Sequence, residues 1–211
     1  ALRAKEAAGL YLTGSRRPFA FQGVKLRLGP GRLLPGKEVA PAPPPPPGPF
    51  APLEARRDYL DHLRKSAQGL ALKRGVVYLD AMGGAGGGIL GQVLKRLEAP
   101  VELRELHPLP HPLFYGVAPD PRPEHLRTLR LLLREAKPPA LGLALDGDAD
   151  RLGVYLPGGE ALPGDQALAR LREAAQGREV EALGEGAYRF PWHLEEPDPF
   201  LAALLLMGVL L

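Results

Sequence analysis

"LALDGDADRLGVYL", residues 143–156, places three alternate aspartates between two apolar runs. The apolar runs predict two buried strands joined by a short turn. Carboxylates at this spacing repel one another unless a cation lies among them. Asp146, Asp148 and Asp150 offer the hard oxygen ligands that Mg²⁺ and Ca²⁺ prefer. We therefore predict a site for a hard divalent cation on this turn.

Two other interpretations of the turn compete with the metal site. An EF-hand calcium loop also begins with alternate aspartates, but here Arg151 stands where that loop needs glycine and Pro157 where it needs glutamate. A solvated turn without metal is the second, since aspartate and glycine are ordinary turn residues. Three acids within five positions favour the metal site over the solvated turn.

The composition indicates a globular chain without thiol chemistry. The 211 residues suffice for one large domain or two small ones, and a hydrophobic share of 45% allows a packed core. A formal net charge of +3, spread along the chain, tolerates an anionic ligand but does not argue for nucleic acid. The absence of cysteine excludes disulfides, zinc–thiolate sites and a thiol nucleophile.

The sequence carries no recognisable signal peptide, so we expect a cytoplasmic protein without a membrane partner. The apolar run Phe200–Leu211 is too short to span a bilayer and predicts a buried helix instead. The first residue is not methionine, which is consistent with a processed or partial sequence. The oligomeric state stays open.

Beyond residue 53 the apolar periodicity alternates between strand and helix, which predicts an α/β fold of mixed-to-parallel sheet layers with helices. Strands are expected at 10–13, 19–28, 76–79, 101–106, 141–145 and 152–156, and helices at 58–67, 89–97, 123–136 and 166–174. Near the start of the chain, residues 1–8 predict the end of a helix, and three side chains are expected to point inward: Phe19, Phe21 and Val24.

A proline-rich stretch divides the chain. "APAPPPPPGPFAP", residues 40–52, cannot lie inside a helix or a sheet, because proline lacks the N–H and restricts its neighbour. It predicts a stiff polyproline II connector. A proline-rich ligand for a partner domain is the alternative interpretation.

A glycine cluster, "DAMGGAGGGILGQV" at residues 80–93, lies between a predicted strand and a predicted helix. It contains the spacing of a dinucleotide-binding loop, followed by an acidic residue on the next strand: Gly86, Gly88, Gly91 and Glu102 or Glu105. The strand ends several residues too early for that loop, and no Gly-Lys-Ser/Thr follows as in a P-loop. We therefore expect the glycines to serve packing and loop geometry.

A serine among cations marks the segment "YLTGSRRPFAFQGVKL", residues 11–26. Ser15 follows a short predicted strand, and Arg16, Arg17 and Lys25 lie nearby in the sequence. Such a serine can carry a phosphate, since the cations offset its charge. A basic surface loop is the alternative.

Together these motifs resemble the α-D-phosphohexomutases, the phosphoglucomutases and phosphomannomutases. The run Asp-Gly-Asp-Ala-Asp-Arg is identical to the metal loop usual in that family. The similarity extends in order over about residues 10–175, with a weaker echo at 184–206 that looks like a shortened sugar-recognition loop. The individual matching segments are 12–26 (phosphoserine segment), 76–87 (first strand and loop of the second domain), 118–126 and 162–171.

The resemblance implies four domains around a cleft, Mg²⁺ as cofactor and a hexose phosphate, such as glucose or mannose phosphate, as substrate. It also implies the domain division of this chain: 1–40 part of the phosphoserine domain, 41–52 a proline-rich linker, 53–162 the α/β metal-loop domain, and 163–211 a reduced remnant of the third domain.

The resemblance further implies a role for each matched residue. Ser15 is the phosphate carrier, Lys25 the proton-transfer residue, and Arg151 orients the phosphoserine. Arg16 and Glu185 bind substrate. The metal ligands are Ser15 with Asp146, Asp148 and Asp150.

The sequence departs from the family pattern at several points, among them Phe21-Gln22 in place of the usual Tyr-Asn and a sugar loop of which only Gly184-Glu185 is clear. Arg16 and Arg17 replace the usual His–Asn pair, and most of a third domain between Gln176 and Gly184 and all of a fourth are missing. A phosphosugar mutase is therefore the first hypothesis. A catalytically inactive sugar-phosphate or metal-binding relative and a dinucleotide-binding oxidoreductase are the alternatives.

Overall fold

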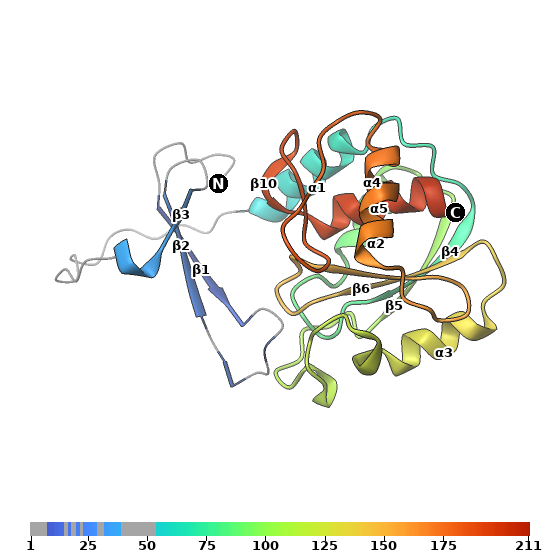
Figure 1. Cartoon of the computed structure of the whole chain (residues 1–211), viewed down its shortest axis with the longest axis horizontal. Helices are drawn as coiled ribbons and strands as arrows, with labels where there is room; N and C mark the ends of the chain where they lie inside the picture. The colour runs from blue at the N-terminus through green and yellow to red at the C-terminus, as the bar shows by residue number, and fades with distance from the viewer. Residues whose placement is uncertain (1–7, 15–16, 18–19, 22, 29–31, 39–53) are drawn as a thin grey trace.

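The computed structural model of the chain describes residues 8–14, 17, 20–21, 23–28, 32–38 and 54–211. It consists of a large α/β body and a small antiparallel sheet beside it (Figure 1). The expected proline-rich connector and the expected helix over residues 1–7 lie outside the described residues. Ala8, the last residue of that expected helix, belongs to a strand.

A four-stranded sheet forms the centre of the body, in the order β5-β4-β6-β7. β4 pairs in parallel with both β5 and β6, whereas β7 pairs antiparallel with β6. β7 reverses because the turn of 146–151 is too short for a parallel crossover. The bounds are Gly75–Asp80 for β4, Val101–Leu106 for β5, Ala140–Leu145 for β6 and Leu152–Tyr155 for β7.

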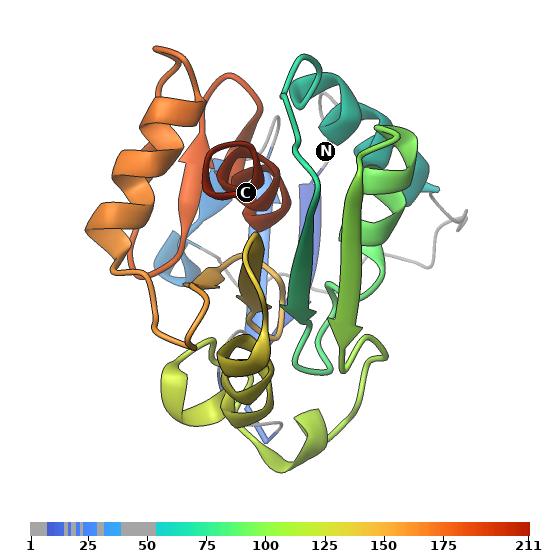
Figure 2. The same cartoon turned by 90° about the vertical axis from the view of Figure 1, so that its right-hand side faces the viewer.

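Helices cover both faces of this sheet, and α5 is seen end-on beside it in Figure 2. Val77 and Leu143 point to the face covered by α1, α2 and α5, whereas Tyr78 and Ala144 point to the face covered by α3. This alternation is the period-2 pattern of a strand buried on both sides. The bounds are Ala55–Ser66 for α1, Ile89–Arg96 for α2, Arg127–Glu135 for α3, Gly164–Ala174 for α4 and Pro199–Leu210 for α5.

The expected α/β fold is confirmed, with small shifts at the element ends. The helix expected at 123–136 opens with a 3₁₀ turn, Pro123–His125, before α3 begins. A second small sheet, in the order β10-β9-β8, follows α4. Its strands are Glu181–Ala182 (β8), Tyr188–Phe190 (β9) and Leu194–Pro197 (β10).

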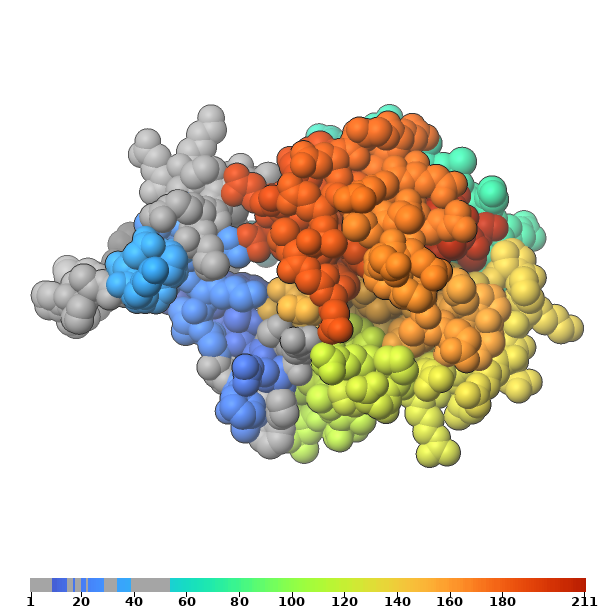
Figure 3. Space-filling model, viewed as in Figure 1, coloured from blue at the N-terminus to red at the C-terminus, as the bar shows by residue number. Residues whose placement is uncertain are grey.

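A third sheet, in the order β1-β2-β3, lies against the α/β body (Figure 3). Its hairpin pairs Thr13 with Gly23 and Tyr11 with Lys25, so these side chains share one face. The strands are Ala8–Thr13 (β1), Gly23–Leu28 (β2) and Arg32–Leu34 (β3), with a 3₁₀ turn at Gly36–Glu38.

The inward orientation expected for Phe21 and Val24 is wrong. Their exposed fractions are 51% and 57%, and Val24 lies on the same outward face as Leu10 and Leu12. The hairpin turns its polar face toward the body, so its apolar face is directed away from it. Phe19, the third of these residues, lies outside the described part.

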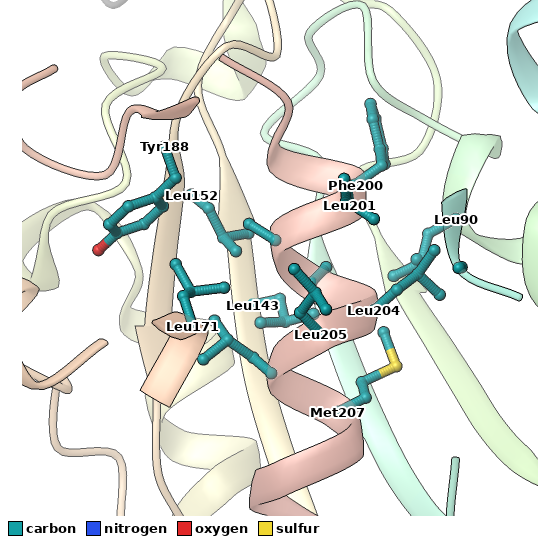
Figure 4. Close-up of a cluster of buried hydrophobic side chains, with 14 of the residues drawn as sticks. Leu90, Leu143, Leu152, Leu171, Tyr188, Phe200, Leu201, Leu204, Leu205 and Met207 are labelled. Atoms are coloured by element: carbon teal, nitrogen blue, oxygen red, sulfur yellow. The ribbon is translucent and has the colours of Figure 1, made fainter. Parts of the chain in front are cut away.

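The apolar C-terminal run forms α5, a buried helix as expected. It is apolar all round, and Leu201, Leu204 and Leu205 pack into the core shared by the sheet, α1, α2 and α4 (Figure 4). Residues on both sides of position 162 contribute to this core. None of the helices in the described part is long and apolar enough to cross a membrane.

Asp198 caps α5 and ties it to α1. Its Oδ1 accepts hydrogen bonds from the backbone N–H groups of Phe200 (2.9 Å) and Leu201 (3.0 Å). Its Oδ2 accepts from the Tyr59 hydroxyl (2.9 Å) and contacts His193 Nε2 (2.8 Å). Burial and this carboxylate raise the pKa of Tyr59, so its hydroxyl stays a neutral donor.

We expect Asp198→Ala to lower the free energy of unfolding by about 2–4 kcal/mol. The substitution removes a helix cap and leaves two buried side chains, Tyr59 and His193, without this hydrogen-bond partner. Urea denaturation measures this. The control is Asp165→Ala, an exposed acid in the first turn of α4, for which we expect less than about 1 kcal/mol. Equal losses in the two variants would contradict the assigned role of Asp198.

Candidate metal centre

The aspartate turn is held in shape by its own first residue. Asp146 follows the last residue of β6, and its side chain is fully buried. Its Oδ1 accepts the backbone N–H groups of Asp150 (3.0 Å) and Arg151 (3.1 Å). Ala149 has a φ of +55°, which lets the chain reverse within the turn. The turn is therefore fixed before any ligand binds.

Each of the three carboxylates has one oxygen that accepts a hydrogen bond and one that accepts none from the described residues. Asp148 Oδ2 accepts from Thr13 Oγ1 (2.5 Å) and lies 3.6 Å from Lys25 Nζ, whereas Asp150 Oδ2 lies 3.4 Å from the same amine. Three buried oxygens have no hydrogen-bond partner among the described residues: Asp146 Oδ2, Asp148 Oδ1 and Asp150 Oδ1.

These aspartates fit a shared divalent cation. One ligand atom from each lies within 4.8 Å of the others. Mg²⁺ and Ca²⁺ bind oxygen ligands at about 2.0–2.6 Å, so one ion can serve three carboxylates grouped this closely. Buried oxygens that lack a donor are the atoms that such an ion would satisfy.

The electrostatics of the turn also favour a cation. Burial, together with the charges of Asp150 and Asp148, raises the pKa of Asp146 to about 8. Ionising this carboxyl therefore costs free energy in the folded chain, and without a cation its contribution to stability becomes less favourable as the pH rises from about 4 toward 8. A divalent cation among the three carboxylates would offset that cost.

The hairpin contributes two further groups to the turn. Tyr11 donates its hydroxyl to the backbone carbonyl of Asp148 at 3.4 Å. Burial and the aspartates raise the pKa of Tyr11 to about 12, so it remains a neutral donor. Neither Tyr11 nor Thr13 was among the residues expected from sequence. The period-2 alternation of β1, which puts both on the face of Lys25, is the signal that could have found them.

Arg151 connects the aspartate turn to the loop that carries Glu185. Its Nη1 donates to the Glu185 carbonyl at 3.1 Å, and its Nε lies 3.8 Å from Asp146 Oδ2 and 3.7 Å from Asp150 Oδ1. The Glu185 carboxylate in turn accepts from Arg122 Nη2 at 3.2 Å. Arg122 is a third residue of the site, after Tyr11 and Thr13, that was not expected from the sequence.

A cleft of about 350 Å³ lies beside the turn. It includes Arg122 and Arg151 together with Asp120, Glu185 and the start of α4, so charged groups of both signs line it. Its lining is Asp120, Pro121, Arg122, Pro123, Arg151, Leu152, Gly153, Val154, Tyr155, Ala161, Leu162, Gly164, Ala167, Glu185, Gly186 and Tyr188.

The glycine cluster, residues 80–93, packs against the backbone of the aspartate turn. Ala85 N–H donates to the Gly147 carbonyl at 3.0 Å, and a Cβ at Gly84 would come within 2.6 Å of that same oxygen. A Cβ at Gly86 would come within 2.5 Å of Leu145. These contacts agree with the packing role expected for the cluster.

The start of α2 is already occupied by a carboxylate. Gly88 has a φ of +72°, and its N–H donates to Glu105 Oε1 at 2.7 Å. A dinucleotide would place its pyrophosphate at that helix N-terminus. Glu105 takes this position instead, which argues against the nucleotide-binding alternative.

The structure thus brings together six of the residues expected for the site. They are Lys25, Asp146, Asp148, Asp150, Arg151 and Glu185. Ser15 and Arg16 lie outside the described residues. Arg17 lies on the surface, with its guanidinium carbon 5.5 Å from the ring centroid of Phe21.

The fold and this turn define an α/β protein with a candidate divalent-cation site. Residues 57–159 match the family model described as phosphoglucomutase/phosphomannomutase, alpha/beta/alpha domain II. The chain is 31% identical over 173 residues to a phosphoglucomutase of Neisseria meningitidis serogroup B and 27% identical over 184 residues to a phosphomannomutase of Salmonella typhimurium. The chain belongs to the α-D-phosphohexomutase family.

Solved structures agree with this assignment. The crystal structure of a candidate phosphomannomutase from Thermus thermophilus superposes with a TM-score of 0.81 at 29% identity, over 98% of this chain and 60% of that one. A family protein from Burkholderia thailandensis gives a TM-score of 0.73 at 19% identity, over 96% of this chain and 55% of that one, and shows the fold alone. The matches to the two curated relatives cover 76% and 79% of this chain but only 36% and 40% of the relatives.

We expect Asp148→Asn to weaken Mg²⁺ binding at least about tenfold, because it removes a charge and an anionic ligand from the turn. Isothermal titration calorimetry measures the affinity. Asp61→Asn, an acid on the exposed side of α1, is the matched control and should bind as the wild type does. The same Mg²⁺ affinity in wild type and Asp148→Asn would remove the metal assignment.

Proposed function

We propose that this chain carries the metal-binding and phosphate-carrying parts of a phosphohexomutase. Such an enzyme moves phosphate between C1 and C6 of a hexose phosphate through a phosphoserine and a sugar bisphosphate. The observation that carries the proposal is the set of three buried carboxylate oxygens without a donor in the described part. They lie beside Thr13 and Lys25, which bracket Ser15 in the sequence.

The charges in two segments, residues 15–25 and the aspartate turn at 146–151, support a phosphoserine at position 15. Three aspartates bring three negative charges, a divalent cation leaves about one, and a phosphoserine adds about 1.5–2. Four cations from the same segments offset this load: Arg16, Arg17, Lys25 and Arg151. Two of them, Lys25 and Arg151, lie within 4 Å of aspartate oxygens.

In the proposed transfer, a new P–O bond forms to the free hydroxyl of the sugar as the bond to Ser15 Oγ breaks. The ammonium group of Lys25 donates a proton to the departing Ser15 Oγ, and the amine that results takes the proton of the sugar hydroxyl, so protons balance. Arg151 holds the phosphoserine in place. Mg²⁺, held by the three aspartates and a phosphoserine oxygen, would neutralise charge on the phosphoryl group.

The cleft supplies the sugar end of the proposed site. Glu185, whose carboxylate is held by Arg122, would accept hydrogen bonds from sugar hydroxyls, and Arg16 would bind the phosphate. Glucose and mannose phosphates are the proposed substrates, since relatives carry both the phosphoglucomutase and the phosphomannomutase names.

We expect the Mg²⁺-loaded protein to gain the mass of one phosphate after incubation with glucose 1,6-bisphosphate, because the reverse half-reaction phosphorylates the carrier serine. Intact-mass spectrometry detects the gain. Ser15→Ala should abolish it, whereas Ser66→Ala, which changes the other serine of the sequence, should leave it unchanged.

Two outcomes would contradict the carrier role of Ser15. One is a phosphate gain that survives Ser15→Ala. The other is the absence of any gain in a sample that binds Mg²⁺, which would instead select the catalytically inactive, metal-binding relative.

A further inference from the structure

Asp148 differs from the other two aspartates in what holds it. Asp146 is oriented by backbone N–H groups of its own turn, and Asp150 faces the amine of Lys25. Asp148 Oδ2 lies 3.6 Å from the same amine, but its shortest contact is with a neutral hydroxyl from a distant strand, that of Thr13, at 2.5 Å and 135 positions away in the sequence. The Asp148 side chain is only 6% exposed, and its Oδ1 has no hydrogen-bond partner in the described part.

The hairpin geometry presents the Thr13 hydroxyl to the turn. Thr13 ends β1 and pairs across the hairpin with Gly23, which has no side chain to cover it. A Cβ at Gly23 would come within 3.1 Å of the Thr13 carbonyl, and a Cβ at Gly14 within 2.9 Å of the Phe21 carbonyl. Both glycines therefore allow the backbone to approach these carbonyls closely at the end of the hairpin that carries Thr13.

A carboxylate needs such a partner because its plane is otherwise poorly fixed. The last torsion of an aspartate side chain has broad minima, so the plane turns freely unless a hydrogen bond holds one oxygen. Groups that bond the far oxygen or nitrogen of a metal ligand typically change metal affinity about 10–100-fold when they are removed. Thr13 is such a group for Asp148, because it bonds Oδ2 while Oδ1 is left for the metal.

We infer that Thr13 is a positioning residue of the metal centre: its hydroxyl fixes the plane of Asp148, so that Oδ1 faces the cation. This inference rests on the metal site proposed above. It makes metal affinity depend on how the β1–β2 hairpin docks, since Thr13 and Lys25 reach the turn from the same face of that hairpin. Docking of the hairpin, whose connecting segment carries Ser15, is thereby coupled to binding of the cation.

The test compares Thr13→Val, which removes the hydroxyl but keeps the shape and strand preference, with Thr13→Ser, which keeps the hydroxyl. Calorimetric titration of the protein with Mg²⁺ should give a dissociation constant about 10–100-fold weaker for Thr13→Val and within about threefold of wild type for Thr13→Ser. Thr128→Val is the matched control, because Thr128 is exposed on α3 and should bind as the wild type does.

The melting temperature without metal separates positioning from folding. It should be nearly the same for wild type, Thr13→Val and Thr13→Ser, while the rise on adding Mg²⁺ should shrink for Thr13→Val alone. If Thr13→Val does not fold, Thr13→Ala takes its place in the same comparison.

Two results would overturn the inference, and they differ. Equal Mg²⁺ affinity in wild type and Thr13→Val would exclude the positioning role and leave the metal site intact. No Mg²⁺ binding by the wild type would exclude the metal site itself, and Thr13 with it.

Discussion

Repulsion among three carboxylates on one turn is the constraint on which the site depends. Burial of Asp146, together with the charges of Asp150 and Asp148, raises its pKa to about 8, so the turn is costly to ionise without a cation. The surrounding structure holds the turn in that costly arrangement. The glycine cluster packs closely against Gly147. The β1–β2 hairpin contacts Asp148 through Thr13 and Asp150 through Lys25. Pre-formed ligands that lack a donor are what a cation site requires.

The core explains why the turn does not relax. Asp146 directly follows β6, and all six residues of that strand are buried between helices. The apolar helix α5 packs on the sheet face that Leu141, Leu143 and Leu145 of β6 share. Asp198 caps this helix and also accepts a hydrogen bond from Tyr59 of α1. Moving Asp146 toward solvent would therefore disturb β6 and the packing on both of its faces. The segment after residue 162 is in this way part of the support of the metal centre.

Local features of the site were predictable from sequence, whereas long-range ones were not. The ligand turn was predictable because spacing alone brings Asp146 and Asp150 together, and strands and helices follow from their apolar periods. The alternation of β1 places Thr13 on the face of Lys25, but its contact with Asp148 also depends on how the hairpin docks, which no local pattern encodes. The same limit explains the wrong inward orientation of Phe21 and Val24, since alternation gives two faces but not which one is covered.

The most direct test of the account is a crystal structure of the protein soaked with Mn²⁺, located by its anomalous scattering. Mn²⁺ takes the same oxygen ligands as Mg²⁺ and can be seen unambiguously. The account predicts one anomalous peak in contact with the three oxygens Asp146 Oδ2, Asp148 Oδ1 and Asp150 Oδ1. A turn without a peak, with those oxygens bonded to Lys25 and Arg151 instead, would contradict it.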